Sequence, residues 1–131
     1  MEDNKSIRIL YVDDSSTVRD MVEGCLLELG YFNIQAAEDG LEALSLAQEE
    51  EYDFIITDIN MPNMDGIEFI QNLRETFTYA VTPIMVLSTE WTDKMKKKGK
   101  DAGATSWIVK PFDKELIYRG IKETIAKVNE G

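Results

Sequence analysis

Three carboxylates, one lysine and one serine stand at the ends of short apolar runs in this sequence. If those runs are parallel strands of one sheet, their carboxyl ends lie along one edge, where such sheets bind ligands. The sequence therefore predicts one polar site assembled from four strands. The residues are Asp13 and Asp14 after residues 7–12, Asp58 after 54–57, Ser88 after 84–87 and Lys110 after 106–109.

These residue types suit magnesium and phosphoryl transfer. Two carboxylates about 4 Å apart repel by about 4 kcal/mol at an effective dielectric of about 20, so a cation must offset them. Mg²⁺ prefers oxygen ligands, and the chain has no histidine and one cysteine for a softer metal. Mg²⁺, Lys110 and either the Ser88 hydroxyl or a backbone N–H could each hold one phosphoryl oxygen. Asp58 is the first candidate nucleophile because it stands alone, and spacing leaves Asp13 and Asp14 open.

Short apolar runs alternate with longer amphipathic segments along the chain, which predicts strands and helices in turn. The last three strands are nearly continuous apolar runs, as strands covered on both faces should be. Five strands alternating with five helices predict an α/β fold with a parallel sheet between helical layers. The predicted strands are residues 7–12, 34–37, 54–57, 84–87 and 106–109, and the predicted helices are about 16–29, 41–50, 67–75, 92–102 and 114–128.

The first two helices illustrate how the core is assigned. Ser15 or Ser16 is predicted to cap the start of the first helix, and Gly30 is predicted to end it. Its apolar residues recur at helical spacing, so we expect them, Cys25 included, to be core. They are Val18, Met21, Val22, Cys25, Leu26 and Leu29. In the second helix the residues expected to face inward are Leu41, Leu44 and Ala47.

Composition narrows the class of protein. A chain of 131 residues, 44% of them apolar, suits one domain over residues 1–131, and no output domain is expected. The net charge of −11 argues against nucleic acid and anionic membranes as partners. No run approaches the roughly 20 apolar residues of a membrane span, and the single Cys25 excludes an internal disulfide. We therefore expect a cytoplasmic monomer.

A lysine-rich segment contrasts with this acidic background. Residues 94–100 contain five lysines within the predicted fourth helix. Such a run is either a solvated helix face or a surface that docks an acidic segment of a partner. Both interpretations stay open from the sequence.

Five segments, in order, resemble the bacterial response-regulator receiver family over essentially the whole chain. This resemblance implies a doubly wound five-stranded parallel sheet of order 2-1-3-4-5 with five helices, the flavodoxin- and CheY-like fold. It also implies phosphorylation-switched signalling in a two-component system. The segments are ILYVDDS at 9–15, DGLEAL at 39–44, DINMPNMDG at 58–66, AGA at 102–104 and KPF at 110–112.

The resemblance assigns roles to the site residues. Asp58 would accept a phosphoryl group from a histidine kinase, and Lys110 would contact its oxygens. Asp14, Asp58 and the backbone carbonyl of Asn60 would ligate Mg²⁺, with Asp13 acting partly through water.

The resemblance also implies a switch. Ser88 occupies the Ser/Thr switch position and Trp107 the aromatic one, where tyrosine or phenylalanine is more usual. Trp107 cannot donate a phenolic hydroxyl, so both a switch role and simple packing are open for it. Asn60 and Glu90 occupy positions that tune attack by water on the acyl phosphate, and their pairing implies a short-lived phosphorylated state.

Within the family, residues 87–90, 99–100 and 103–112 resemble CheY-type regulators of chemotaxis. This implies a CheA-like histidine kinase as phosphodonor and a target such as a flagellar switch protein. It implies a self-phosphorylating and self-dephosphorylating signalling domain rather than an enzyme. The alternatives are a phosphorelay intermediate or phosphate sink, a magnesium phosphatase with an aspartyl intermediate, and a receiver fragment of a longer regulator.

Overall fold

A computed structural model of the chain describes residues 6–130 and contains one sheet of five parallel strands. The strand order is β2-β1-β3-β4-β5, which confirms the predicted fold class and order. The predicted domain of 1–131 extends beyond this range, because residues 1–5 and 131 lie outside the described part. The strands are β1 (Arg8–Val12), β2 (Asn33–Ala37), β3 (Phe54–Thr57), β4 (Ile84–Ser88) and β5 (Ser106–Val109).

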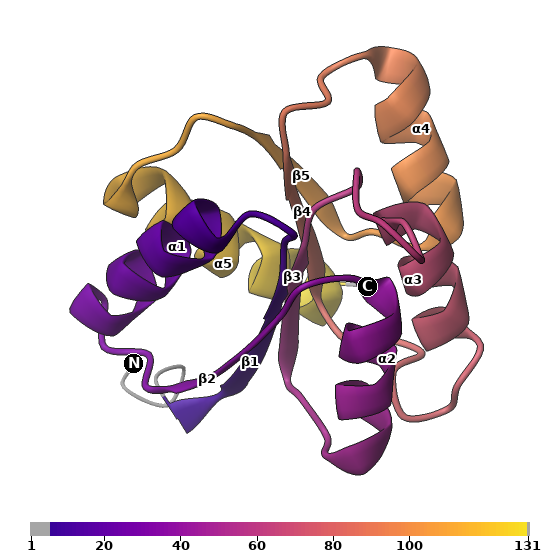
Figure 1. Cartoon of the computed structure of the whole chain (residues 1–131), viewed down its shortest axis with the longest axis horizontal. Coiled ribbons are helices and arrows are strands. Elements are labelled where there is room, and N and C mark those ends of the chain that lie inside the picture. The colour runs from indigo at the N-terminus through magenta and orange to yellow at the C-terminus, as the bar shows by residue number, and fades with distance from the viewer. Residues whose placement is uncertain (1–5, 131) are drawn as a thin grey trace.

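Five helices cover the two faces of the sheet. Figure 1 shows α1 and α5 on one face and α2, α3 and α4 on the other. No helix within residues 6–130 has the length and apolar character that crossing a membrane requires. The helices are α1 (Ser16–Glu28), α2 (Gly40–Glu49), α3 (Gly66–Arg74), α4 (Asp93–Ala102) and α5 (Lys114–Glu130).

Alternation along the strands divides the interior into two cores. Because successive strand residues point to opposite faces, Leu10 and Val12 join the core under α2, α3 and α4. Ile9 and Tyr11 join the core under α1 and α5. The carboxyl end of β1 therefore touches both cores, one residue before the predicted site begins.

The ends of α1 follow the sequence signals. Ser15 is the N-cap, and its hydroxyl accepts a hydrogen bond from the backbone N–H of Val18 at 3.2 Å. Gly30 has a φ of 95°, and the Tyr31 N–H returns to the Leu26 carbonyl at 2.9 Å. This left-handed residue ends the helix as glycine commonly does. Ser15, rather than Ser16, caps the helix.

Two expectations about buried side chains were wrong, because Met21 and Leu41 are each 53% exposed. Cys25 is half-buried, as are Val18 and Leu29 of the same stripe. A helix lying on a sheet buries a narrow arc, and neighbouring residues lie about 100° apart around it. In α2 that arc is taken by Ala43 and Ala47, so Leu41, two positions before Ala43, points to solvent.

Candidate functional site

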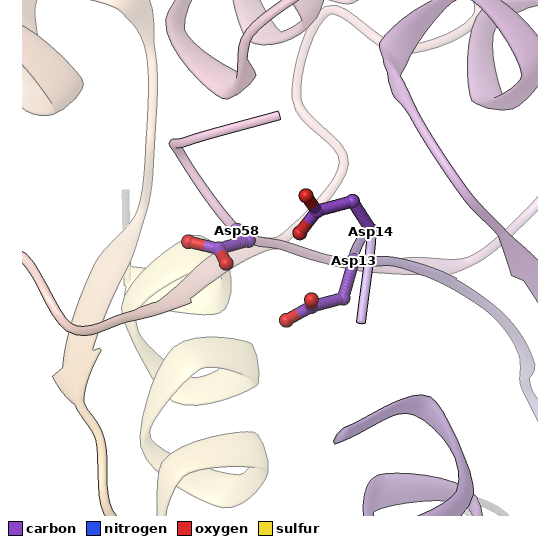
Figure 2. A group of neighbouring side chains, drawn as sticks. All are labelled: Asp13, Asp14 and Asp58. Atoms are coloured by element: carbon purple, nitrogen blue, oxygen red, sulfur yellow. The ribbon is translucent and has the colours of Figure 1, made fainter. Parts of the chain in front are cut away.

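Three carboxylates meet at the carboxyl ends of β1 and β3. Asp13 and Asp14 follow β1, and Asp58 follows β3, the strand beside it. One oxygen of each lies within 4.8 Å of the others. Figure 2 shows Asp58 on one side of the cluster, with the Asp13 and Asp14 side chains directed toward it. Asp13 and Asp58 are buried, whereas Asp14 is exposed.

Lys110 brings the one ammonium that contacts this cluster within the described residues. Its Nζ donates to Asp13 Oδ2 at 2.7 Å and to Asp58 Oδ2 at 3.2 Å. Burial alone would lower the pKa of Lys110, but its hydrogen bond to Asp13 and the charges of Asp58 and Asp13 outweigh that effect, so the pKa is raised. Lys110 is therefore a fixed positive charge that links β5 to β1 and β3.

The Asp58 carboxylate is held by its own loop. The Ile59 N–H donates to Asp58 Oδ1 at 2.6 Å, and the Gly66 N–H returns to the Ile59 carbonyl at 2.8 Å. A Cβ added to Gly66 would lie 2.1 Å from the Asp58 carbonyl oxygen. Only glycine permits α3 to begin this close to β3, so Gly66 helps to place Asp58.

The Asp13 carboxylate has two further donors besides Lys110. The Tyr11 hydroxyl donates to Asp13 Oδ2 at 3.2 Å, and the Ser15 N–H donates to Asp13 Oδ1 at 2.9 Å. Burial above all, and then the negative charge of Asp13, raise the pKa of Tyr11. Tyr11 therefore keeps its proton and remains a donor.

A second hydrogen-bonded group adjoins the carboxylates and centres on Glu90. Asn60 Nδ2 donates to Glu90 Oε2 at 2.8 Å, and the Trp107 indole Nε1 donates to the Glu90 carbonyl at 2.9 Å. The Glu90 N–H donates to Ser88 Oγ at 3.3 Å. The loop after β3 is thus joined to β5 through Glu90.

The donor set fits magnesium. Three carboxylates against one ammonium leave negative charge uncompensated, and all three offer hard oxygen ligands. No other acidic or thiol-containing group of this density occurs among residues 6–130. Asp13, Asp14 and Asp58 are therefore the residues that would hold such an ion.

The sequence profile described as "Response regulator receiver domain" matches residues 9–122, a span that includes every residue of both groups. The chain belongs to the response-regulator receiver family. Curated relatives of this receiver domain match it along nearly the whole chain. Chemotaxis protein CheY-3 of Vibrio cholerae is 37% identical over 127 residues, covering 97% of this chain and 95% of that protein. Chemotaxis protein CheY of Pseudomonas aeruginosa is 32% identical and covers 94% of this chain and 99% of that protein.

Solved structures agree in fold and length. The chemotaxis response regulator CheY4 of Vibrio cholerae superposes with a TM-score of 0.86 at 42% identity, covering 91% of this chain and 98% of that one. The receiver domain of a Pseudomonas aeruginosa sensor histidine kinase superposes with a TM-score of 0.84 at 26% identity, covering 92% of this chain and 98% of that one. That structure has a magnesium ion coordinated in its active-site cleft.

The receiver domain places every predicted site residue in one of its two polar groups. The first contains Asp13, Asp14, Asp58 and Lys110. The second contains Ser88, Asn60, Glu90 and Trp107. Ser88 belongs to this second group because its hydroxyl accepts a hydrogen bond from the Glu90 N–H. The ligand, phosphoacceptor and switch roles of these residues remain predictions.

One residue of this receiver site, Tyr11, was not predicted from the sequence. Its side chain is 1% exposed, and its hydroxyl reaches Asp13 from the core between the sheet, α1 and α5. A signal was present, because residues two apart in an extended segment point to the same side and Tyr11 stands two before Asp13. An aromatic residue with a polar tip at that spacing could have been paired with the carboxylate.

Proposed function

We propose that this receiver domain is a CheY-type response regulator whose Asp58 accepts a phosphoryl group from a histidine kinase. The observation that carries the proposal is the contact of buried Asp58 with Lys110, beside two further carboxylates, at the point where strand order reverses. Ligands bind at such switch points in doubly wound sheets. A free carboxylate in this position can act as a nucleophile.

The proposed step is a transfer between two protein side chains. A P–O bond forms between an Asp58 carboxylate oxygen and phosphorus while the P–N bond to the donor imidazole breaks. Asp13, Asp14, Asp58 and the carbonyl of Asn60 would hold Mg²⁺, which when bound supplies charge neutralisation for the phosphoryl oxygens. Lys110 turns from the carboxylates to one of those oxygens. Ser88 supplies a hydroxyl to another.

We further propose that the domain hydrolyses its own acyl phosphate and acts as a signalling domain rather than as an enzyme. The hydrogen bond between Asn60 and Glu90 supports this, because it holds together the two side chains expected to tune access of water to Asp58. We expect a phosphorylated state that decays in far less than hours. Persistence for many hours under native conditions would contradict this part.

Chemotaxis is the proposed setting, supported by the printed names of the curated relatives and of CheY4. A CheA-like kinase would be the phosphodonor, the target would resemble a flagellar switch protein, and the domain would act in the cytoplasm. A groove of about 260 Å³ between α4, β5 and α5 offers a docking surface. Lys96, Lys100 and Lys127 line it with Trp107, so an acidic segment of the target would suit it.

Intact mass spectrometry with a small phosphodonor and magnesium tests the proposal. The wild type should gain the mass of one phosphoryl group, while Asp58→Asn and chelator-treated protein should gain none. A gain that survives in Asp58→Asn would move the acceptor to another residue. No gain with any donor would make the domain a phosphate-independent binding module.

A further inference from the structure

Asp13 Oδ2 is bound from two sides. Lys110 Nζ approaches it at 2.7 Å from the end of β5, and the Tyr11 hydroxyl approaches it at 3.2 Å from the core. Both Tyr11 and Asp13 are 1% exposed, so solvent does not supply donors to this oxygen. The Tyr11 hydroxyl is therefore the second of two donors to this buried oxygen.

We propose that Tyr11 is a positioning residue for phosphorylation, which keeps Asp13 in place when Lys110 leaves it for the phosphoryl group. The inference rests on the proposed function of Asp58. Lys110 is shared between Asp13 and Asp58 before the reaction. Two of the three N–H groups of the Lys110 ammonium are used by these carboxylates, so a movement of Nζ toward a phosphoryl group on Asp58 lengthens its contact with Asp13.

The cost of that transfer falls on Asp13. A buried carboxylate that loses a donor without replacement is penalised, more strongly than a neutral acceptor would be. Tyr11 already occupies the same oxygen, so Oδ2 keeps one donor when Lys110 moves. The neutral phenol adds no charge that would compete for the phosphoryl oxygens.

The hydrogen bonds also give the two oxygens of Asp13 different roles. A carboxylate oxygen has about two lone-pair sites, and both sites of Oδ2 are taken by Lys110 and Tyr11. Oδ1 has one donor, the Ser15 N–H at 2.9 Å. Oδ1 is thus the oxygen with a site left for a cation or its water. Removing the Tyr11 hydroxyl leaves this oxygen and its donor in place.

Tyr11→Phe tests the inference, with Tyr31→Phe as the matched control. Tyr31 is a second fully buried tyrosine of the same core and is not among the donors to Asp13 within residues 6–130. For each variant two quantities are measured: magnesium affinity by calorimetry, and the rate of phosphorylation at saturating magnesium over a range of phosphodonor concentrations. Urea unfolding in chelator confirms that both variants fold.

Tyr11→Phe should lower the maximal phosphorylation rate roughly tenfold, the effect of losing one hydrogen bond to a charged group. Its magnesium affinity and its half-saturating phosphodonor concentration should stay within about twofold of the wild type, and Tyr31→Phe should change none of the three. In an Asp13→Ala background, Tyr11→Phe should slow the reaction no further, because Tyr11 acts through Asp13.

Each remaining outcome decides against the inference. An unchanged rate in Tyr11→Phe, or an equal loss in Tyr31→Phe, leaves Tyr11 a packing residue. Parallel losses of magnesium affinity and rate would mark a loosened site instead of a held Asp13. A wild type that takes up no phosphoryl group overturns the proposed function itself, which is distinguishable because the wild-type arm then fails and not only the variant.

Discussion

Close approach of the backbone positions the Asp13 and Asp58 carboxylates as much as charge does. Asp58 and Asp13 are held by the N–H groups of Ile59 and Ser15, and these contacts exist only if the loops after β3 and β1 fold tightly. Gly66 is the tightest point, because α3 begins against the Asp58 carbonyl. A methyl group there should disturb both the packing and the position of Asp58.

Gly66→Ala should lower the free energy of unfolding by about 1–3 kcal/mol, the usual range for overpacking a close contact. Its added Cβ would lie 2.1 Å from the Asp58 carbonyl oxygen and 2.8 Å from Ile59 Cα. Urea unfolding measures the change. Gly24→Ala in α1 is the control, since nothing lies within 4 Å of its Cβ, and it should stabilise the helix by about 0.5–1 kcal/mol. Equal effects of the two substitutions would contradict the steric argument.

The contrast between α3 and α4 stands out at the element scale. The buried residues of α3 include Phe69, Ile70 and Leu73, whereas those of α4 are Gly99 and Ala102. A Cβ on Gly99 would lie 2.6 Å from the Trp107 ring, so α4 rests on β5 through a glycine and an aromatic edge. Helix α4 therefore buries little apolar surface of its own.

We expect the backbone amides of α4 to exchange with solvent at least roughly tenfold faster than those of α3. The physical reason is that local opening of α4 exposes few large apolar side chains, whereas opening of α3 exposes three. Hydrogen exchange followed by mass spectrometry or NMR measures this in the unphosphorylated protein. Comparable protection of the two helices would show that α4 is anchored by contacts other than apolar burial.

The groove between α4, β5 and α5, lined by Lys96, Lys100 and Lys127, gives a second prediction for α4. Lys96→Glu combined with Lys100→Glu should weaken binding of an acidic target segment at least roughly tenfold, because two attractive charges become repulsive. Calorimetry or fluorescence with the phosphorylated domain measures the affinity. Lys98→Glu is the control: Lys98 is exposed on the same helix but does not line the groove. Equal losses with Lys98→Glu would indicate long-range charge rather than docking in the groove.

Sequence patterns predicted the elements well because each carries its own signal. The ranges expected for β3 and β5 agree with the structure, and Gly30 and Ser15 end and begin α1 as such residues usually do. Which arc of a helix is buried was predicted less well. That arc depends on how closely the helix approaches the sheet, and in α2 small residues allow an approach that leaves Leu41 outside.

The site residues that stand at strand ends could be predicted from the sequence. The one that belongs to the core could not. Asp13, Asp58 and Lys110 converge because parallel strands end along one edge. Tyr11 lies inside a strand among apolar neighbours, so its type and position both suggested packing. Its hydroxyl becomes meaningful only when the strand is oriented relative to Asp13.

The raised pKa values of several buried groups predict that the folded protein loses stability at high pH. Burial raises the pKa values of Tyr11, Tyr31, Tyr52 and Tyr79 above the ordinary 10.0. The raised pKa of Lys110 acts in the same direction. Each of these groups keeps its proton longer in the folded chain than in the unfolded one, so the native state binds more protons in this range. Their stabilisation is complete below the ordinary pKa values and is lost as pH rises through the folded values.

The free energy of unfolding should therefore fall steadily once pH exceeds 10.0. Urea unfolding at a series of alkaline pH values measures this slope. Tyr31→Phe should make the slope shallower, since it removes one buried phenol that only the unfolded chain can ionise. A slope that is unchanged by Tyr31→Phe would assign the alkaline loss to other groups.

The division of the interior into two cores bears on how many partner proteins the domain can bind at once. Tyr11 reaches the carboxylates from the layer of α1 and α5, while Trp107 packs against the layer that contains α4. The sheet lies between these two layers, as Figure 1 shows. A protein that binds one helical layer leaves the other helical layer exposed, so two partners could bind the domain at the same time. Each would affect the other through side chains at the carboxyl ends of the strands, where Tyr11 contacts Asp13 and Trp107 contacts Glu90.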